Sequence, residues 1–176
     1  MRESSAATGC RRAEALIRPI NNAGIGTHGR FEEIDPEREQ EEIMLNTAAL
    51  VDLTHHFLPG MLERKDGVVV NVASMAAFAP CAYSAVYGAT KAFVLSFSEA
   101  LWAETRGRGV RVLTLCPGAT DTGFFDAVGS RDMAAGSALS TPEKVVQAGF
   151  RGIDKGCSYI VDGRNNYLAA LRLSRF

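Results

Sequence analysis

Residues 67–91 read GVVVNVASMAAFAPCAYSAVYGATK, and this stretch decides the fold class. It begins with an apolar run, Val68 to Ala73, in which polar and apolar positions do not alternate; this predicts a strand buried on both faces. Residues 84–106 carry apolar side chains at helical spacing and are followed by glycines, which predicts a long helix. A doubly buried strand that leads into a long helix is typical of a parallel α/β sheet.

The same alternation continues on both sides of this stretch. Asp35 and Pro36 have the residue types of a helix N-cap and first position, and apolar residues recur near helical spacing through residues 36–64. Thr141, Pro142 and Glu143 form the same kind of helix start. We therefore expect helices over 13–18, 36–64, 84–106, 142–153 and 166–176, strands over 68–73, 110–116 and 159–161, and loops with short helical turns over 119–140.

Composition narrows the possible functions. The chain has 176 residues, 47% of them hydrophobic, with 19 Lys and Arg against 20 Asp and Glu. This predicts one globular domain over residues 1–176 without the basic surface that nucleic acid or an anionic membrane requires. The longest uncharged stretch, residues 67–90, could span a bilayer in length, but Asn71, Ser74 and Pro80 interrupt it.

The cysteines and histidines do not form a metal-binding pattern. Cys10, Cys81, Cys116 and Cys157 are scattered singly, which predicts a reduced, cytoplasmic protein without a zinc site. The adjacent pair His55-His56 would point to different faces of a helix, so one metal ion could not readily bind both.

Chemistry is indicated by Tyr87 and Lys91, which lie four residues apart and therefore on one face of the predicted helix. A free tyrosine has a pKa near 10, and a neighbouring ammonium group is expected to lower the pKa of Tyr87. Ser74 follows the buried strand, where α/β sheets bind ligands, although it could equally cap the strand end. Asn46 lies inside the first long helix, with either a functional role or a solvent-facing position.

Taken together, these residues resemble the short-chain dehydrogenase/reductase family over about residues 17–165. The resemblance rests on Asn21-Asn22-Ala23-Gly24, Asn46, Ser74, Tyr87-x-x-x-Lys91 and Pro117-Gly118-x-x-x-Thr122, in the family's order and spacing. It implies a Rossmann-like, doubly wound parallel sheet with flanking helices. It also implies an NAD(P)-dependent oxidoreductase that interconverts a carbonyl and a secondary alcohol.

The resemblance also implies a role for each matching residue. Tyr87 would be the general acid/base, Ser74 would bind the substrate oxygen with it, and Lys91 would lower the pKa of Tyr87 and contact the nicotinamide ribose. Asn46 would hold a water that connects Lys91 to solvent. The remaining matches would bind the cofactor: Asn22, Ala23 and Gly24 near its adenosine half, and Pro117, Gly118 and Thr122 near the nicotinamide.

The N-terminal part departs from the family. The Gly-rich phosphate loop is missing, because Thr8-Gly9-Cys10-Arg11 lacks the later glycines, and the first βαβ half of the fold is largely missing. Residues 1–16 thus form an atypical remnant, and we expect weak or no dinucleotide binding. Arg11 or Arg12 could favour the 2′-phosphate of NADP over NAD, or could belong to an exposed basic turn. An alternative function is an inactive remnant that serves only as an oligomerising or binding module.

Three further expectations concern surfaces. The part of the chain expected to border the substrate is apolar, with Met75, Phe78, Pro80 and Cys81. These side chains would either contact an apolar substrate or simply pack within the loop. Phe124 and Phe125 could form a lid or belong to the core. Residues 40–62 and 88–105 carry apolar side chains on more than one helix face, which together with the family resemblance predicts a homodimer or homotetramer.

Overall fold

The computed structural model describes residues 18–134 and 138–173. The predictions for residues 1–16, including the remnant of the phosphate loop, the roles of Arg11 and Arg12 and most of the helix expected over 13–18, lie outside the described residues. None of the described helices is long and apolar enough to cross a membrane.

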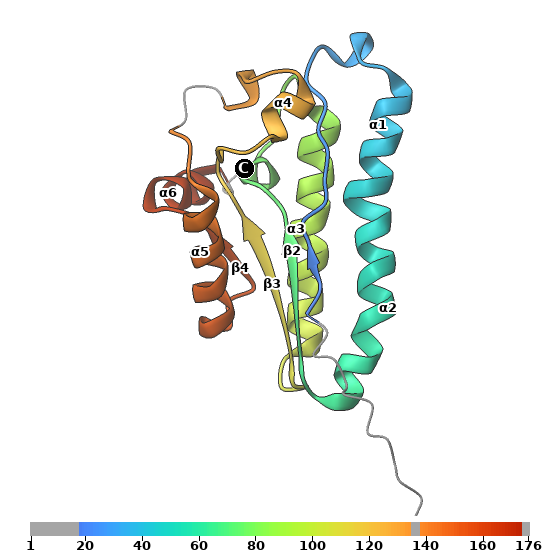
Figure 1. The fold of residues 1–176 in the computed structure, drawn as a ribbon, viewed down its shortest axis with the longest axis vertical. Helices are drawn as coiled ribbons and strands as arrows, with labels where there is room; N and C mark the ends of the chain where they lie inside the picture. The colour runs from blue at the N-terminus through green and yellow to red at the C-terminus, as the bar shows by residue number, and fades with distance from the viewer. Residues whose placement is uncertain (1–17, 135–137, 174–176) are drawn as a thin grey trace, which may run out of the picture.

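The described part of the chain contains one sheet of four parallel strands in the order β1-β2-β3-β4 (Figure 1). The strands are β1 (Ile20–Asn21), β2 (Gly67–Val72), β3 (Val110–Cys116) and β4 (Tyr159–Val161). The predicted α/β fold with a parallel sheet is confirmed. The strand expected over 68–73 begins and ends one residue earlier, and the short strand β1 was not predicted as such.

The helix predicted over 36–64 is continuous but not uniform. It consists of α1 (Pro36–Ile43), a π-helical segment η2 (Met44–Ala48) and α2 (Ala49–Arg64). Asp35 caps its start as predicted, because its Oδ1 accepts a hydrogen bond from the Glu37 backbone N–H at 3.0 Å. The π segment was not predicted, and it contains Asn46.

The other helices follow their predicted ranges closely. They are α3 (Ala85–Thr105), α5 (Pro142–Lys155) and α6 (Arg164–Leu173). The loops contain the short helices η1 (Phe31–Glu33), η3 (Met75–Phe78), α4 (Phe124–Val128) and η4 (Asp132–Ala134).

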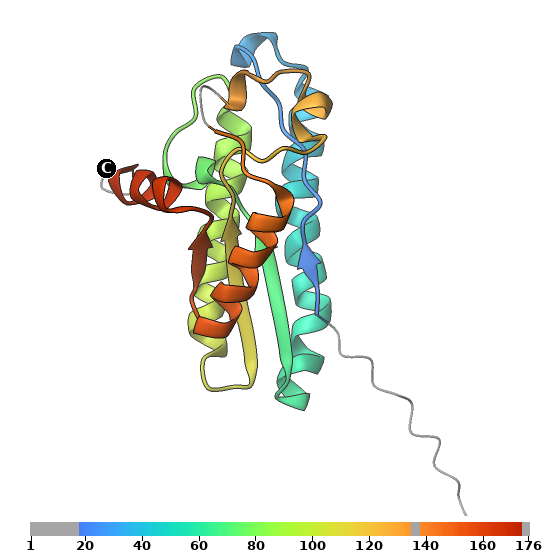
Figure 2. The ribbon, with the colours of Figure 1, turned by 60° about the vertical axis from the view of Figure 1, so that its left-hand side comes forward.

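Helices cover both faces of the sheet, as Figures 1 and 2 show. On one face Val69 and Val112 pack against Met61 of α2 and residues of α3. On the other face Val68, Val70 and Leu115 pack with Val145 of α5. Burial on both faces explains why β2 and β3 are almost uniformly apolar.

The parallel arrangement places the ends of all four strands at one edge of the sheet. Asn22 follows β1, Ala73 and Ser74 follow β2, Pro117 follows β3, and Asp162 follows β4. The residues that were singled out far apart in the sequence therefore meet at this edge.

Candidate active site

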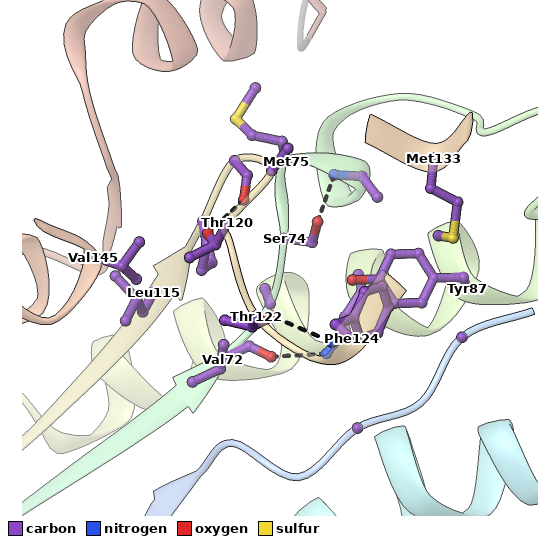
Figure 3. A pocket seen from close by; sticks show the side chains of 18 of the residues that line it. Val72, Ser74, Met75, Tyr87, Leu115, Thr120, Thr122, Phe124, Met133 and Val145 are labelled. Atoms are coloured by element: carbon purple, nitrogen blue, oxygen red, sulfur yellow. Dashed lines mark hydrogen bonds between the residues drawn. The ribbon is translucent and has the colours of Figure 1, made fainter. Parts of the chain in front are cut away.

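A cavity of about 1680 Å³ opens at the carboxyl ends of the strands. Most of the predicted site residues line it: Asn22, Gly24, Ser74, Tyr87, Lys91, Pro117, Gly118 and Thr122. Figure 3 shows Ser74, Tyr87, Thr122 and Phe124 gathered around it from different segments of the chain. Ala23 is exposed and does not line the cavity, and Asn46 lies buried behind the lining residues.

Tyr87 lies in the first turn of α3 and is only 8% exposed. Its ring is 5.5 Å, centroid to centroid, from the ring of Phe124. Burial raises the pKa of Tyr87 to about 12, and the hydrogen-bonding Ser74 side chain acts in the opposite direction. The prediction that Tyr87 has a lowered pKa is therefore wrong for this structure, because desolvation of the phenolate outweighs its polar neighbours.

Lys91 lies one turn further along α3 and is 6% exposed. Its Nζ donates a hydrogen bond to the backbone carbonyl of Val72 at 3.0 Å and is 5.7 Å from the Tyr87 ring centroid. Burial lowers the pKa of Lys91 to about 8, while the negative charge of Glu42 acts to raise it. An amine with this pKa can exchange a proton near neutral pH.

Ser74 has a capping role, one of the two that the sequence left open, and it also lies at the cavity. Its hydroxyl accepts a hydrogen bond from the Ala76 backbone N–H at 3.2 Å and so caps η3. The same residue lines the cavity and interacts with Tyr87. Capping η3 holds the serine at the end of β2, at the border of the cavity, and its role in binding a substrate oxygen stays a prediction.

Asn46 is buried, so the solvent-facing alternative is wrong. Its Oδ1 accepts from the Ile25 backbone N–H at 3.0 Å, and its Nδ2 donates to the Ile25 carbonyl at 2.8 Å and to Thr90 Oγ1 at 3.1 Å. Asn46 thus ties the segment after β1 to both the π segment and α3. The water-holding role stays a prediction.

Two glycines let the backbone of residues 24–26 approach the site closely. A Cβ atom on Gly24 would lie 3.0 Å from Asn46 Oδ1 and 3.3 Å from Lys91 Nζ. On Gly26 it would lie 3.0 Å from the Phe124 ring and 3.1 Å from the Tyr87 ring. A larger residue at either position would push against the side chains that form the site, which is why glycine suits both.

Asp162 anchors the segment that follows β3, and the sequence analysis missed it. This carboxylate is buried, and its Oδ1 accepts from the Gly118 backbone N–H at 2.6 Å and from Asn166 Nδ2 at 3.2 Å. Its Oδ2 accepts from Ser140 Oγ at 2.6 Å. Its position directly after the last strand is the only sequence signal that could have indicated it.

Glu42 is the second residue that was missed. It lies in the last turn of α1, is fully buried, and interacts electrostatically with Lys91 and Tyr87. Its position one turn before Asn46 on the same helix is a signal that could have been used, because residues four apart share a face.

Comparison with known proteins assigns the family. A family model described as short chain dehydrogenase matches residues 8–132, most of the chain. The chain belongs to the short-chain dehydrogenase family. This short-chain dehydrogenase is 33% identical over 159 residues to ketoacyl reductase HetN of Nostoc sp., with 87% of this chain and 55% of HetN covered. It is 40% identical over 106 residues to serine 3-dehydrogenase of Rhizobium radiobacter, with 60% and 42% covered.

A solved structure agrees with this assignment. A short-chain dehydrogenase from Sphingobium yanoikuyae in complex with NADPH matches with a TM-score of 0.80 and 32% identity, covering 93% of this chain and 65% of that one. This short-chain dehydrogenase therefore shares the fold of that protein, which confirms the Rossmann-like architecture. It spans about half the length of the curated relatives named here.

Proposed function

We propose that the chain is an NAD(P)-dependent oxidoreductase that interconverts a carbonyl and a secondary alcohol. The observation that carries this proposal is the convergence of Ser74, Tyr87 and Lys91 on one cavity, next to glycine backbone that permits close approach. The names of its relatives, a ketoacyl reductase and a dehydrogenase, support the same class of reaction.

The described residues fit the nicotinamide half of such a cofactor. Lys91 and Tyr87 would hold the ribose, and Pro117, Gly118 and Thr122 would border the ring. Asn22 and Gly24 would lie nearer the adenosine half, where Ala23, which does not line the cavity, could contribute only its backbone. The cofactor supplies the hydride. The structural neighbours include complexes with NADPH and NADP and one with NADH, so they support a nicotinamide cofactor of either form, and NADP is only slightly favoured.

Tyr87 acts as the proton donor in carbonyl reduction. A pKa of about 12 keeps the phenol protonated at neutral pH, which is the form needed to protonate the substrate oxygen. Ser74 donates a hydrogen bond to the same oxygen, and Lys91 stabilises the phenolate that remains and helps to return its proton.

The substrate is a fairly apolar small molecule. Met75, Cys81, Phe124 and Met133 line the cavity around the polar centre. An apolar lining with a few convergent polar groups favours ligands of this kind. Cys81 is half-buried at this border, and burial raises the pKa of its thiol, which keeps it neutral at neutral pH.

A homodimer or homotetramer forms through residues 40–62 and 88–105. Exposed apolar side chains on these helices include Ile43, Met44, Leu53 and Phe93, and Phe93 stacks on Phe97 at 5.8 Å. A second copy of the chain would cover this surface. Light scattering is expected to show an oligomer, and a stable monomer would contradict it.

The test is oxidation of NADPH against a panel of ketones that differ in size and polarity, run at millimolar cofactor because binding is expected to be weak. The wild-type chain should reduce the more apolar ketones, and Tyr87→Phe should lower the rate by about 10²–10⁴-fold, since it removes the proton donor. Tyr167→Phe is the matched control, because Tyr167 is exposed and does not line the cavity.

Calorimetric titration with NADPH and NADH measures cofactor binding separately. Micromolar affinity would contradict the expectation of weak binding. A folded chain that reduces none of the ketones at millimolar NADPH would favour the alternative, an inactive oligomerising module.

A further inference from the structure

Glu42 is a buried carboxyl group whose surroundings do not fully satisfy it. It is 0% exposed, and its Oε2 accepts a hydrogen bond from Thr27 Oγ1 at 2.8 Å. Its Oε1 is buried and has no hydrogen-bond partner among the described residues. Burying a carboxylate with an unpaired oxygen costs free energy of folding. Such a group is therefore expected either to carry a proton, which removes the charge, or to serve a function.

The position of Glu42 places it beside the candidate active site. α1 packs against α3, the helix that carries Tyr87 and Lys91. Glu42 lies one turn before Asn46, whose amide and the Lys91 amine both lie within 3.3 Å of the point that a Gly24 Cβ would occupy. Thr27 belongs to the segment that passes over Tyr87 at Gly26.

The charged and titratable groups around Glu42 come from three elements. Glu39 lies on its own helix, and Tyr87 and Lys91 of α3 interact with it electrostatically. In the segment after β1, Thr27 contributes a hydroxyl, and His28 Nδ1 is instead paired with Ser84 Oγ at 3.0 Å. Among the described residues that surround Glu42, Lys91 supplies the positive charge.

These electrostatic interactions make the charges of Glu42 and Lys91 interdependent. Burial and the charge of Glu39 raise the pKa of Glu42, while Thr27 and Lys91 lower it. In return, ionised Glu42 raises the pKa values of Lys91 and Tyr87. A proton on Glu42 thus makes it easier for Lys91 to lose its own.

We propose that Glu42 is a positioning residue of the active site: its carboxyl group, held by Thr27, acts through Lys91 and Tyr87 to set the pH at which they exchange protons with substrate and solvent. This role rests on the oxidoreductase function proposed above. Glu42 does not line the cavity and does not touch the substrate.

The decisive experiment measures the pKa of Lys91 and does not require catalysis. The chain has four lysines, so ¹³Cε-lysine NMR gives four signals, and Lys91→Arg assigns the one of interest. In the wild type this signal should titrate near pH 8. Glu42→Gln should lower that pKa, because it removes a facing negative charge at almost constant volume.

Two further variants complete the test. Thr27→Val keeps the carboxyl group but removes the bond that favours its ionised form, so it should lower the Lys91 pKa by less than Glu42→Gln does. Glu41→Gln changes the neighbouring residue, which is exposed and paired with Arg38 at 3.2 Å, and should leave the Lys91 pKa unchanged.

Ketone reduction measured against pH supplies the catalytic readout. The limb on which kcat falls with rising pH should move to lower pH in Glu42→Gln and stay in place in Glu41→Gln. An unchanged Lys91 pKa in both Glu42→Gln and Thr27→Val overturns the proposal, whether or not the wild type reduces ketones. If the wild type reduces no ketone but Glu42→Gln still lowers the Lys91 pKa, the result overturns the oxidoreductase function on which the proposal rests.

Discussion

One wall of the cavity is a helix face, and another is a loop. The helix wall, formed by Tyr87 and Lys91 of α3 with Asn46 behind them, is almost completely buried. The loop wall, residues 117–134 and 138–141, carries exposed residues such as Thr122 and is anchored near both ends by Asp162. The comparison shows what burial does: on the helix wall it shifts the pKa values of Tyr87 and Lys91, whereas the loop wall is attached to the fold at a few points.

The largest expected effect is on the helix wall. Lys91→Met should lower the rate of ketone reduction by about 10²-fold or more, because the phenolate of Tyr87 loses its neighbouring amine. Steady-state kinetics at millimolar NADPH measure it. Lys144→Met, an exposed lysine on α5, is the control and should keep the wild-type rate. Equal rates in wild type and Lys91→Met would place the proton chemistry elsewhere.

The same variant tests the lowered pKa of Lys91 through stability. Between about pH 8 and the ordinary lysine value of 10.5, the unfolded chain keeps the proton that the folded chain has lost. The free energy of unfolding of the wild type should therefore rise with pH relative to Lys91→Met, by about 1 kcal/mol per pH unit. Urea unfolding at pH 8.0 to 10.0 measures the difference, and a constant difference would mean that the Lys91 pKa is not lowered.

The next largest effect is expected for Asp162, which anchors the loop wall. Asp162→Asn replaces one acceptor oxygen by an NH₂ group. It also removes the negative charge that accepts hydrogen bonds from Gly118, Ser140 and Asn166. The free energy of unfolding should fall by about 1–3 kcal/mol. Asp121→Asn, at an exposed position of the same loop, is the control. If both variants were equally stable, the loop would be held by contacts other than Asp162.

The smallest effect is expected at the exposed part of the loop wall. Thr122→Val removes a hydroxyl that accepts a hydrogen bond from the Phe124 backbone N–H at 3.3 Å in an exposed position. Stability should change by less than about 0.5 kcal/mol. The KM for NADPH should rise while kcat stays near the wild-type value, because Thr122 is proposed to contact the bound cofactor and takes no part in the chemical step. A large loss of stability would show that the loop wall depends on its surface contacts.

Most of the secondary structure could be predicted from the sequence because its signals are local. The apolar runs of β2 and β3, the caps Asp35 and Thr141, and the helical spacing of α3 each lie within a few residues. The π segment was not predicted; it contains Asn46, whose side chain bonds to Ile25, 21 residues away, and such a distant partner leaves no local pattern. Strand β1 was missed because two residues are too few to form a pattern.

The sequence by itself determined that Tyr87 and Lys91 share a helix face and that Ser74 ends a buried strand, since helix and strand geometry place them so. Only the tertiary structure decided the surroundings of these groups. It buried Tyr87 enough to raise its pKa, brought the carboxyl group of Glu42 within electrostatic range of Lys91, and bound Asp162 to the loop after β3. Desolvation and charge interaction depend on which elements pack together, and no local pattern in the sequence records that packing.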